Sequence, residues 1–434
     1  MAISIEQQPR LYSVAGHPVV IGLSSDNSAE DGFRFRVHIE MSLVTDHVTL
    51  FVPPQGAVTK IDIRSLLDNR LNDVLSGTIH SQAGGGIYGD ANDSINTVSV
   101  SVTEWWLVDG ILTEADEDQE SCEFVVVNGH FDNKTNFNPD TEGSNTDYAF
   151  NLNGNTKRFF SDRKFNTHIW DRAQSFSITP SAQTIFIPSF ESDYGVLGFS
   201  NNNDPWLSAN IIDKIQVTIY AANGAPTAYT ETIGGGGEPL ANAFVYPANL
   251  NASTATGIVK PSNYPNWRFY TVRALDSSNA AVSALYVFYN AELYGQSDCK
   301  HNKVRLAWQN SRGGWDYFNF IKKNEESLNI ERTTFRKLRG YDTGGNFDYG
   351  AYEAGTTIQA VKATKSLTIT SDWISENEFV FLQSLLVSRQ VHWLQDDGYY
   401  YPVVIDNTDY TLARERNGKL KNLNLKLAMA NQYV

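Results

Sequence analysis

One segment, residues 299–340, constrains the fold of this chain more than any other, because it combines strand periodicity with a dense set of aromatic residues. Val304, Leu306 and Trp308 alternate with polar or small residues, and this period of two predicts a strand with one buried face. Residues 309–314 contain Asn, Ser and two Gly residues, which is typical of a turn. The segment therefore predicts a hairpin that packs on a core.

The second strand of this hairpin carries its aromatic residues in an irregular order. Trp315 and Tyr317 would lie on one face of a regular strand, whereas Phe318 and Phe320 would lie on the other. This change of phase indicates either a β-bulge or burial on both faces. Because an isolated hairpin is barely stable in water, we predict that Trp308, Trp315 and Phe320 are structural residues in a core or an interface.

Length and composition favour a mainly β protein with several domains. A chain of 434 residues has room for two to four domains, and a hydrophobic content of 41% predicts packed cores. Aromatic residues make up 12% of the chain, and the abundance of Gly, Asn, Thr and Ser favours strands and turns over helices. The net charge of −15 argues against general binding to nucleic acid, because an acidic surface repels phosphates.

Two cysteines, Cys122 and Cys299, are too few for a disulfide scaffold. We expect both thiols to be reduced, although a single bridge between them stays open. The N-terminal residues lack the basic and apolar regions of a secretory signal, and no apolar run reaches the length of a membrane span. The sequence therefore predicts synthesis in a cytoplasm, without a membrane span.

Residues 1–132 are predicted to form an N-terminal domain resembling a β-sandwich, with one inserted helix. The expected strands are 19–23, 33–41, 48–52, 98–110 and 122–130, and a short helix begun by Asp62 is expected within residues 60–71. The residues after Gly110 are read as a loop that includes the acidic run 114–120.

Residues 133–335 are predicted to form one or two central β-sandwich domains that end in the aromatic hairpin. A polar stretch over 131–160 leads into them, and it indicates a long loop or a boundary. The expected strands are 184–188, 213–224, 267–276 and 283–293.

Residues 336–434 are predicted to form an α+β module that contains one helix. Ser375 and Glu378 form a capping box, Ile374 and Phe379 a hydrophobic staple, and Leu382 continues the apolar stripe. The expected strands are 356–373, 391–395, 399–406, 410–416 and 419–431, with turns at Asp396–Gly398 and Asn417–Gly418.

The stretches VRLAWQN, RGGWDYFNF and IERTTF within residues 299–340 resemble a segment of bacteriophage tail-tip or baseplate structural proteins of the distal-tail kind, as in phages of Bacteroidetes-type hosts. The C-terminal order of a strand, the helix ISENEFVFLQSLL, a DG hairpin with a PVVI strand, and a last strand ending in LAMAN is similar to the C-terminal module of the same proteins. The resemblance implies a virion structural role in a closed ring of identical subunits around the tail axis.

The sequence gives little support for a calcium site. The acidic run contains Glu114, Asp116, Glu117, Asp118 and Glu120, but it lacks the spaced pattern with a central Gly of a helix-loop-helix calcium site. We therefore favour a solvated turn over a calcium site, which stays open.

Cys299 and His301 could begin a zinc site, but no second pair with suitable spacing follows. Asp342, Asp348 and Glu353 could pair as glycosidase carboxylates, although a surface loop is favoured. The sequence has no G-x-S-x-G elbow, and the glycine runs at 84–86 and 234–237 lack the ending of a phosphate loop. We predict no catalytic, cofactor or metal residue.

Two sets of adjacent aromatic residues indicate aromatic side chains on both faces of a strand. Trp105 and Trp106 would face opposite sides of a strand, and Tyr400 would face away from Tyr399 and Tyr401. Some of them must therefore lie in a second core, in a subunit interface or on a sugar-binding platform, and we favour the interface.

The sequence-based hypothesis is a non-enzymatic structural protein of the virion tail, located at the tail tip or baseplate or in a distal-tail ring. The expected partners are copies of the chain in a ring, which could be hexameric, and other phage tail proteins. The alternative is a carbohydrate-binding receptor-binding protein on the virion, which would use host surface glycans and exposed coplanar aromatic residues. Composition fits both, so the arrangement of the aromatic residues must decide between them.

Overall fold

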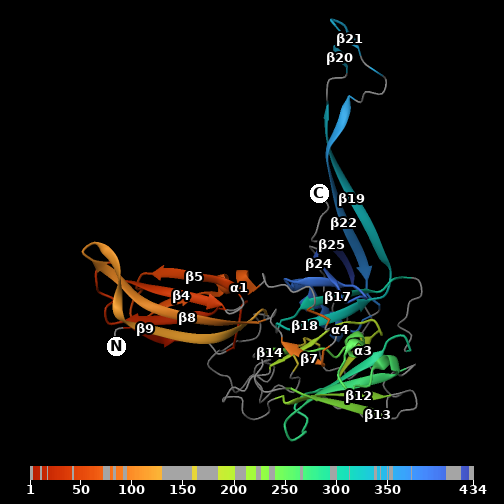
Figure 1. Ribbon diagram of the computed structural model, residues 1–434, viewed down its shortest axis with the longest axis horizontal. Helices are drawn as coiled ribbons and strands as arrows, with labels where there is room; N and C mark the ends of the chain where they lie inside the picture. Colours follow the sequence, from red (N-terminus) through yellow and green to blue (C-terminus); the bar gives the residue numbers. More distant parts are fainter. Residues whose placement is uncertain are drawn as a thin grey trace.

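The computed structural model of the chain describes residues 3–9, 12–16, 18–41, 44–71, 79–81, 85–90, 95–129, 159–163, 184–200, 212–220, 226–233, 240–263, 267–293, 301–311, 313–336, 340–342, 344–348, 350, 355–372, 374–406 and 422–429. Strands dominate these residues and helices are short, which confirms the prediction of a mainly β, multi-domain fold. An N-terminal pair of sheets, a central pair of sheets and a C-terminal sheet with a projecting arm follow one another (Figure 1).

The N-terminal part consists of a five-stranded sheet in the order β2-β9-β8-β4-β5 and a three-stranded sheet in the order β1-β3-β6, which share one core. Phe33, Phe35, Val37 and Ile39 are buried, as their alternation predicts. The elements are β1 (Ile3–Gln7), β2 (Tyr12–Val14), β3 (Val20–Ser25), β4 (Arg34–Met41), β5 (Val44–Val52), β6 (Thr59–Asp62), α1 (Arg64–Leu71), β8 (Ile95–Val108) and β9 (Ile111–Val127).

Two predictions for this part are wrong in detail. The helix expected to begin at Asp62 begins at Arg64, because Asp62 still pairs with β3 as the last residue of β6, although its carboxylate accepts the backbone N–H of Arg64 at 3.0 Å. The acidic run 114–120, expected in a loop, belongs to β9. The chain reverses earlier, at Asp109 and Gly110, whose φ angles of 52° and 78° suit a two-residue hairpin turn.

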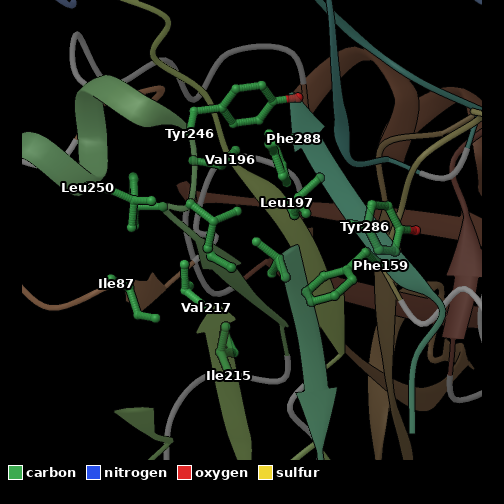
Figure 2. Packing of buried hydrophobic residues seen from close by; sticks show 14 of the residues in the cluster. Ile87, Phe159, Val196, Leu197, Ile215, Val217, Tyr246, Leu250, Tyr286 and Phe288 are labelled. Carbon is green, nitrogen blue, oxygen red and sulfur yellow. The ribbon is translucent and has the colours of Figure 1, made fainter. Parts of the chain in front are cut away.

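The central part contains a five-stranded sheet in the order β10-β16-β15-β12-β13 and a three-stranded sheet in the order β11-β14-β7. Ile215, Val217, Tyr286 and Phe288 from the larger sheet pack against residues of the smaller sheet and its connections, as in Figure 2. The elements are β7 (Tyr88–Asp90), β10 (Thr184–Ser189), β11 (Leu197–Ser200), β12 (Lys214–Tyr220), β13 (Pro226–Thr232), β14 (Leu240–Ala243), α3 (Pro247–Ala252), a 3-10 turn (Pro261–Asn263), β15 (Phe269–Leu275) and β16 (Leu285–Asn290).

The C-terminal part is a seven-stranded sheet in the order β18-β17-β23-β24-β25-β22-β19, with helix α4 packed on one face. Helix α4 begins with the predicted capping box of Ser375 and Glu378. The elements are β17 (Val304–Gln309), β18 (Trp315–Phe320), β19 (Asn324–Arg336), β20 (Tyr341–Asp342), β21 (Phe347–Asp348), β22 (Thr356–Thr370), α4 (Glu376–Val387), β23 (Val391–Leu394), β24 (Tyr400–Ile405) and β25 (Asn424–Met429).

The domain boundaries expected at residues 132 and 335 stay predictions. Two sheets contain strands from both sides of an expected boundary. Strand β7 lies in the first predicted segment but pairs with β14 of the central part. Strand β17 lies in the second predicted segment but pairs with β23 of the C-terminal part.

The aromatic hairpin β17–β18 is buried on both faces, so the expectation that β17 has one buried face is wrong. All six residues of β17 are buried, including Arg305. Trp308 and Phe320 pack in the C-terminal core with α4, whereas Trp315 and Tyr317 pack in the central core. The pairing of β17 with β18 is regular, so burial on both faces explains the change of phase in the sequence.

Strands β19 and β22 extend beyond the sheet as a two-stranded arm, and β20 and β21 lie at its end (Figure 1). Strand β22 pairs with β25 only over Ser366–Thr370, so its first ten residues pair with β19 alone. Over the arm the sheet therefore consists of two strands, and most of the arm's residues are exposed on both faces.

Several predicted features lie outside the described residues. They are the Asn417–Gly418 turn, the strand over 410–416, Cys299, Glu353, the glycine run 234–237, and most of the polar stretch 131–160. Among the residues that are described, no helix has the length and apolar character needed to cross a membrane.

We predict that Leu382→Ala lowers the free energy of unfolding by about 2–5 kcal/mol, because it leaves a cavity where Leu382 is fully buried in the C-terminal core. The matched control is Val380→Ala on the same helix, where the side chain is exposed and a much smaller effect is expected. Denaturant unfolding measures both variants. Equal effects would contradict the packing of α4 on the sheet.

Candidate functional site

The densest polar cluster among the described residues lies where the aromatic hairpin meets the central part. Arg305 Nη1 donates to Asp193 Oδ2 at 3.1 Å and to Asn319 Oδ1 at 3.1 Å. Lys303 Nζ donates to Asp193 Oδ1 at 2.7 Å. Asp193 is fully buried, and its carboxylate also accepts the backbone N–H of Phe190 at 3.0 Å. One carboxylate thus joins the turn after β10 to Arg305 in β17 and to Lys303 immediately before that strand.

Two tyrosine rings enclose the guanidinium of Arg305. Its central carbon lies 4.8 Å from the ring centroids of both Tyr246 and Tyr317, which is a cation–π geometry. Burial opposes ionisation of Asp193, but the charges of Arg305 and Lys303 outweigh it and hold the pKa of Asp193 below its ordinary value. Asp193 therefore keeps its negative charge in the folded protein.

A buried pair of histidines lies beside this cluster. His80 Nε2 and His392 Nδ1 are 3.0 Å apart, and His80 Nδ1 is 2.9 Å from the hydroxyl of Tyr317. The short contact between the rings requires one of the two facing nitrogens to be without a proton. Burial, followed by the charges of His392 and Arg305, holds the pKa of His80 well below its ordinary value, and burial lowers the pKa of His392 to about 4.

A third buried cluster surrounds Asp316 at the turn of the hairpin. Its carboxylate accepts the hydroxyl of Ser161 at 2.6 Å, the backbone N–H of Asp162 at 2.8 Å and the side-chain amide of Asn310 at 3.0 Å. Burial, together with the neighbouring Asp162 carboxylate, raises the pKa of Asp316 to about 6. These bonds tie residues 159–163 to the hairpin.

The three clusters support a structural role more than a chemical one. Asp193, His80, Asp316 and Arg305 are all buried, so a substrate has no access to them in this conformation. Within the described part of the chain, no group of three His, Cys, Asp or Glu side chains is placed to hold a metal ion. What the arrangement does is fix the central part, residues 159–163 and the C-terminal sheet to one hairpin.

The five predicted core residues lie around this hairpin and α4. Trp308 donates its indole N–H to the hydroxyl of Ser384 in α4 at 2.9 Å, and Trp315 packs against His80. Phe320, Phe379 and Leu382 are buried in the C-terminal core.

The adjacent aromatic residues separate as the alternation predicts. Trp106 packs against the N-terminal core, whereas Trp105 lies on the outer face with Phe51, at a ring distance of 5.6 Å and an angle of 85°. Tyr400 stacks on His392 at 4.1 Å and packs against the central core. Its neighbours Tyr399 and Tyr401 are exposed by 65% and 51%.

The other described candidates lie in two places, strand β9 and the end of the arm. Cys122 is buried with a free thiol, and burial raises the pKa of that thiol. Asp342 and Asp348 lie on β20 and β21 at the end of the arm, where Asp342 pairs with Phe347 and Asp348 with Tyr341. Glu114 is exposed and lies 3.5 Å from Arg36 in an ion pair.

Sequence reasoning missed the buried polar residues. Arg305 looked solvent-exposed because it alternates with Leu306, and only the aromatic residues on both faces of β18 pointed to a second buried face. His80 and His392 are 312 positions apart, so no local pattern links them.

No protein-family model matches the chain, and no curated protein matches it either.

We predict that Asp193→Asn lowers the free energy of unfolding by about 3–5 kcal/mol, because it leaves the buried Arg305 without a countercharge. The control is Asp406→Asn, which removes an exposed ion pair with Lys426 and should cost less than about 1 kcal/mol. Chemical denaturation distinguishes them. A loss below 1 kcal/mol in Asp193→Asn would contradict the role given to this ion pair.

We predict that the two histidines make the fold less stable as the pH falls from about 6.5 toward 4. Their folded-state pKa values are below the unfolded value, so the stability that they contribute is complete above about pH 6.5 and is lost as the unfolded chain takes up protons. Asp316 acts in the opposite sense, because its raised pKa makes the fold more stable as the pH falls from about 6 toward 4.

Comparison with His392→Gln separates these effects, since the variant keeps Asp316. Between pH 6 and 4.5 the free energy of unfolding of the wild type should fall more steeply than that of the variant, by up to about 1.4 kcal/mol per pH unit. Urea unfolding at several pH values measures both slopes. Parallel slopes would contradict the buried neutral state of His392.

Proposed function

We propose that this chain is a non-enzymatic structural subunit of a bacteriophage tail, in the tail tip or baseplate or in a distal-tail ring, and that it assembles with copies of itself and with neighbouring tail proteins. The observation that carries the proposal is the arm formed by β19 and β22. Such an arm suits a subunit that contacts a neighbour.

The arm is long and thin for a monomer. Residues 328–336 of β19 pair only with β22, and at about 3.3 Å per residue this ribbon extends roughly 30 Å beyond the sheet. A two-stranded hairpin is only marginally stable in water unless a further layer packs on it. The arm therefore favours a partner that supplies this layer.

One face of the arm carries apolar side chains. Leu328 and Ile330 alternate along β19 with Arg332 and Thr334 after them on the same side, and in β22 Val361 lies opposite Arg332 and Ile358 opposite Thr334. We call Leu328, Ile330, Ile358 and Val361 the apolar arm face. These four side chains are 39–58% exposed.

The apolar arm face continues the core of the sheet. On β22, Leu367 and Ile369 are buried in the C-terminal core and lie on the same side of the strand as Val361. The apolar pattern thus runs on past the point where the chain's own core ends. A solvated arm would gain nothing from this pattern, whereas an arm packed on a neighbour would bury it.

The carbohydrate-binding alternative has less support. A sugar platform needs exposed aromatic rings that are coplanar, but the rings of Phe51 and Trp105 are inclined by 85°, and those of Trp393 and Tyr401 by 57°. The buried clusters likewise lend no support to a glycan-cleaving enzyme, because their carboxylates are inaccessible.

We predict that Ile330→Ser with Val361→Ser raises the concentration needed for assembly by about tenfold or more, because two apolar side chains no longer become buried. Asn329→Ser with Thr364→Ser is the matched control, since these residues pair on the opposite face of the arm. Light scattering over a range of concentrations gives the mass, and cryo-electron microscopy of particles locates the subunit. A protein that stays monomeric, is absent from tails and binds a glycan array would overturn the proposal.

A further inference from the structure

A second exposed apolar surface lies at the turn of the β8–β9 hairpin. Val108 and Ile111 are paired across this turn, and they are 47% and 70% exposed. Leu107 beside them is also exposed, although it contacts Gly32. Three exposed apolar side chains at one turn form an exposed apolar patch, and such patches often mark contact sites. We call Leu107, Val108 and Ile111 the hairpin tip.

Residues of opposite charge follow the hairpin tip and flank the apolar arm face. Arg332 and Arg336 alternate with Leu328 and Ile330 on the same side of β19, toward the end of the arm. Glu326 on this side already pairs with Lys365 at 2.6 Å. The arm face therefore presents apolar side chains next to two arginines.

The residues that follow the hairpin tip are acidic. Between positions 114 and 120 of β9 the sequence has five carboxylates and no Lys or Arg. Glu114, at the start of this run, forms an ion pair with Arg36 at 3.5 Å, and both side chains are partly exposed. An apolar tip followed by an acidic run is thus the complement of an apolar face followed by two arginines.

The two surfaces lie on different sides of the molecule. Strands β8 and β9 are at the left of Figure 1, whereas the arm rises from the right of the body. A contact between them therefore joins two copies. It also joins two different surfaces, so repetition of the contact generates a closed ring or an open helix.

We propose that the apolar arm face of one copy of this chain packs against the hairpin tip of the next copy, with Arg332 and Arg336 directed at the acidic run of β9. This inference rests on the proposed function and names the surface that the arm binds. The occupant of the arm face is a second copy of the chain.

Charge reversal with rescue tests the contact. Arg332→Glu with Arg336→Glu replaces two positive charges by two negative ones, so that the net charge of each copy becomes more negative by four. In the proposed contact these residues face the acidic run, and the double variant should raise the apparent dissociation constant of the assembly about tenfold or more. Adding Glu114→Lys and Glu120→Lys restores the wild-type net charge and should restore assembly. The matched control is Lys60→Glu with Lys426→Glu, which changes the charge equally on exposed residues outside the arm and should have little effect.

Light scattering of the full chain, with circular dichroism to verify folding, gives the mass against the 48.4 kDa monomer. The contact is overturned if the variant with Arg332→Glu and Arg336→Glu assembles like the wild type. It is also overturned if the variant with all four substitutions does not recover assembly. In both cases the proposed function stands. A wild-type chain that is present in tails but monomeric alone also overturns it, because the partner is then another protein. Absence from tails together with a monomeric state overturns the proposed function itself.

Discussion

The buried ion pair of Arg305 and Asp193 is the interaction on which the arrangement of the central and C-terminal parts depends. A guanidinium inside a protein is costly unless a countercharge and hydrogen-bond acceptors meet it, and Asp193, Asn319 and the carbonyl of Tyr194 do so here. Asp193 and Tyr194 come from the segment after β10, whereas Arg305 and Asn319 come from neighbouring strands of the C-terminal sheet. The ion pair therefore favours one relative position of the two parts, which apolar packing alone would specify less sharply.

The contact between the central and C-terminal parts fixes the sheet from which the arm extends. The hairpin β17–β18 and the strands of the arm belong to the same seven-stranded sheet, at its opposite edges. Helix α4 covers one face of that sheet, so the strands enter the arm from a packed layer. An arm that leaves a fixed base presents its apolar face in a defined direction, and less conformational entropy is lost when a partner binds.

Much of the architecture follows from local patterns in the sequence. The alternation in Phe33–Met41, the capping box at Ser375 and the hairpin signals at Gly398 all reflect interactions between near neighbours, and the structure contains them. The second buried face of β17 and the contact of His80 with His392 depend on segments far apart in sequence, so periodicity could not reveal them. The acidic run was placed wrongly because charge density was read as a loop, while the Asp109–Gly110 turn had already reversed the chain.

The distribution of charge favours heterologous over symmetric contacts between copies. At a net charge of −15, two copies repel each other over most orientations. A face-to-face pairing of two arms would also oppose Arg332 and Arg336 of one copy to the same arginines of the other. In the proposed contact, the two arginines of the arm would instead meet the strand after the hairpin tip, whose sequence carries the acidic run. In such a contact apolar burial would supply affinity and charge would supply direction, which is the combination that lets a subunit add to a neighbour in one orientation.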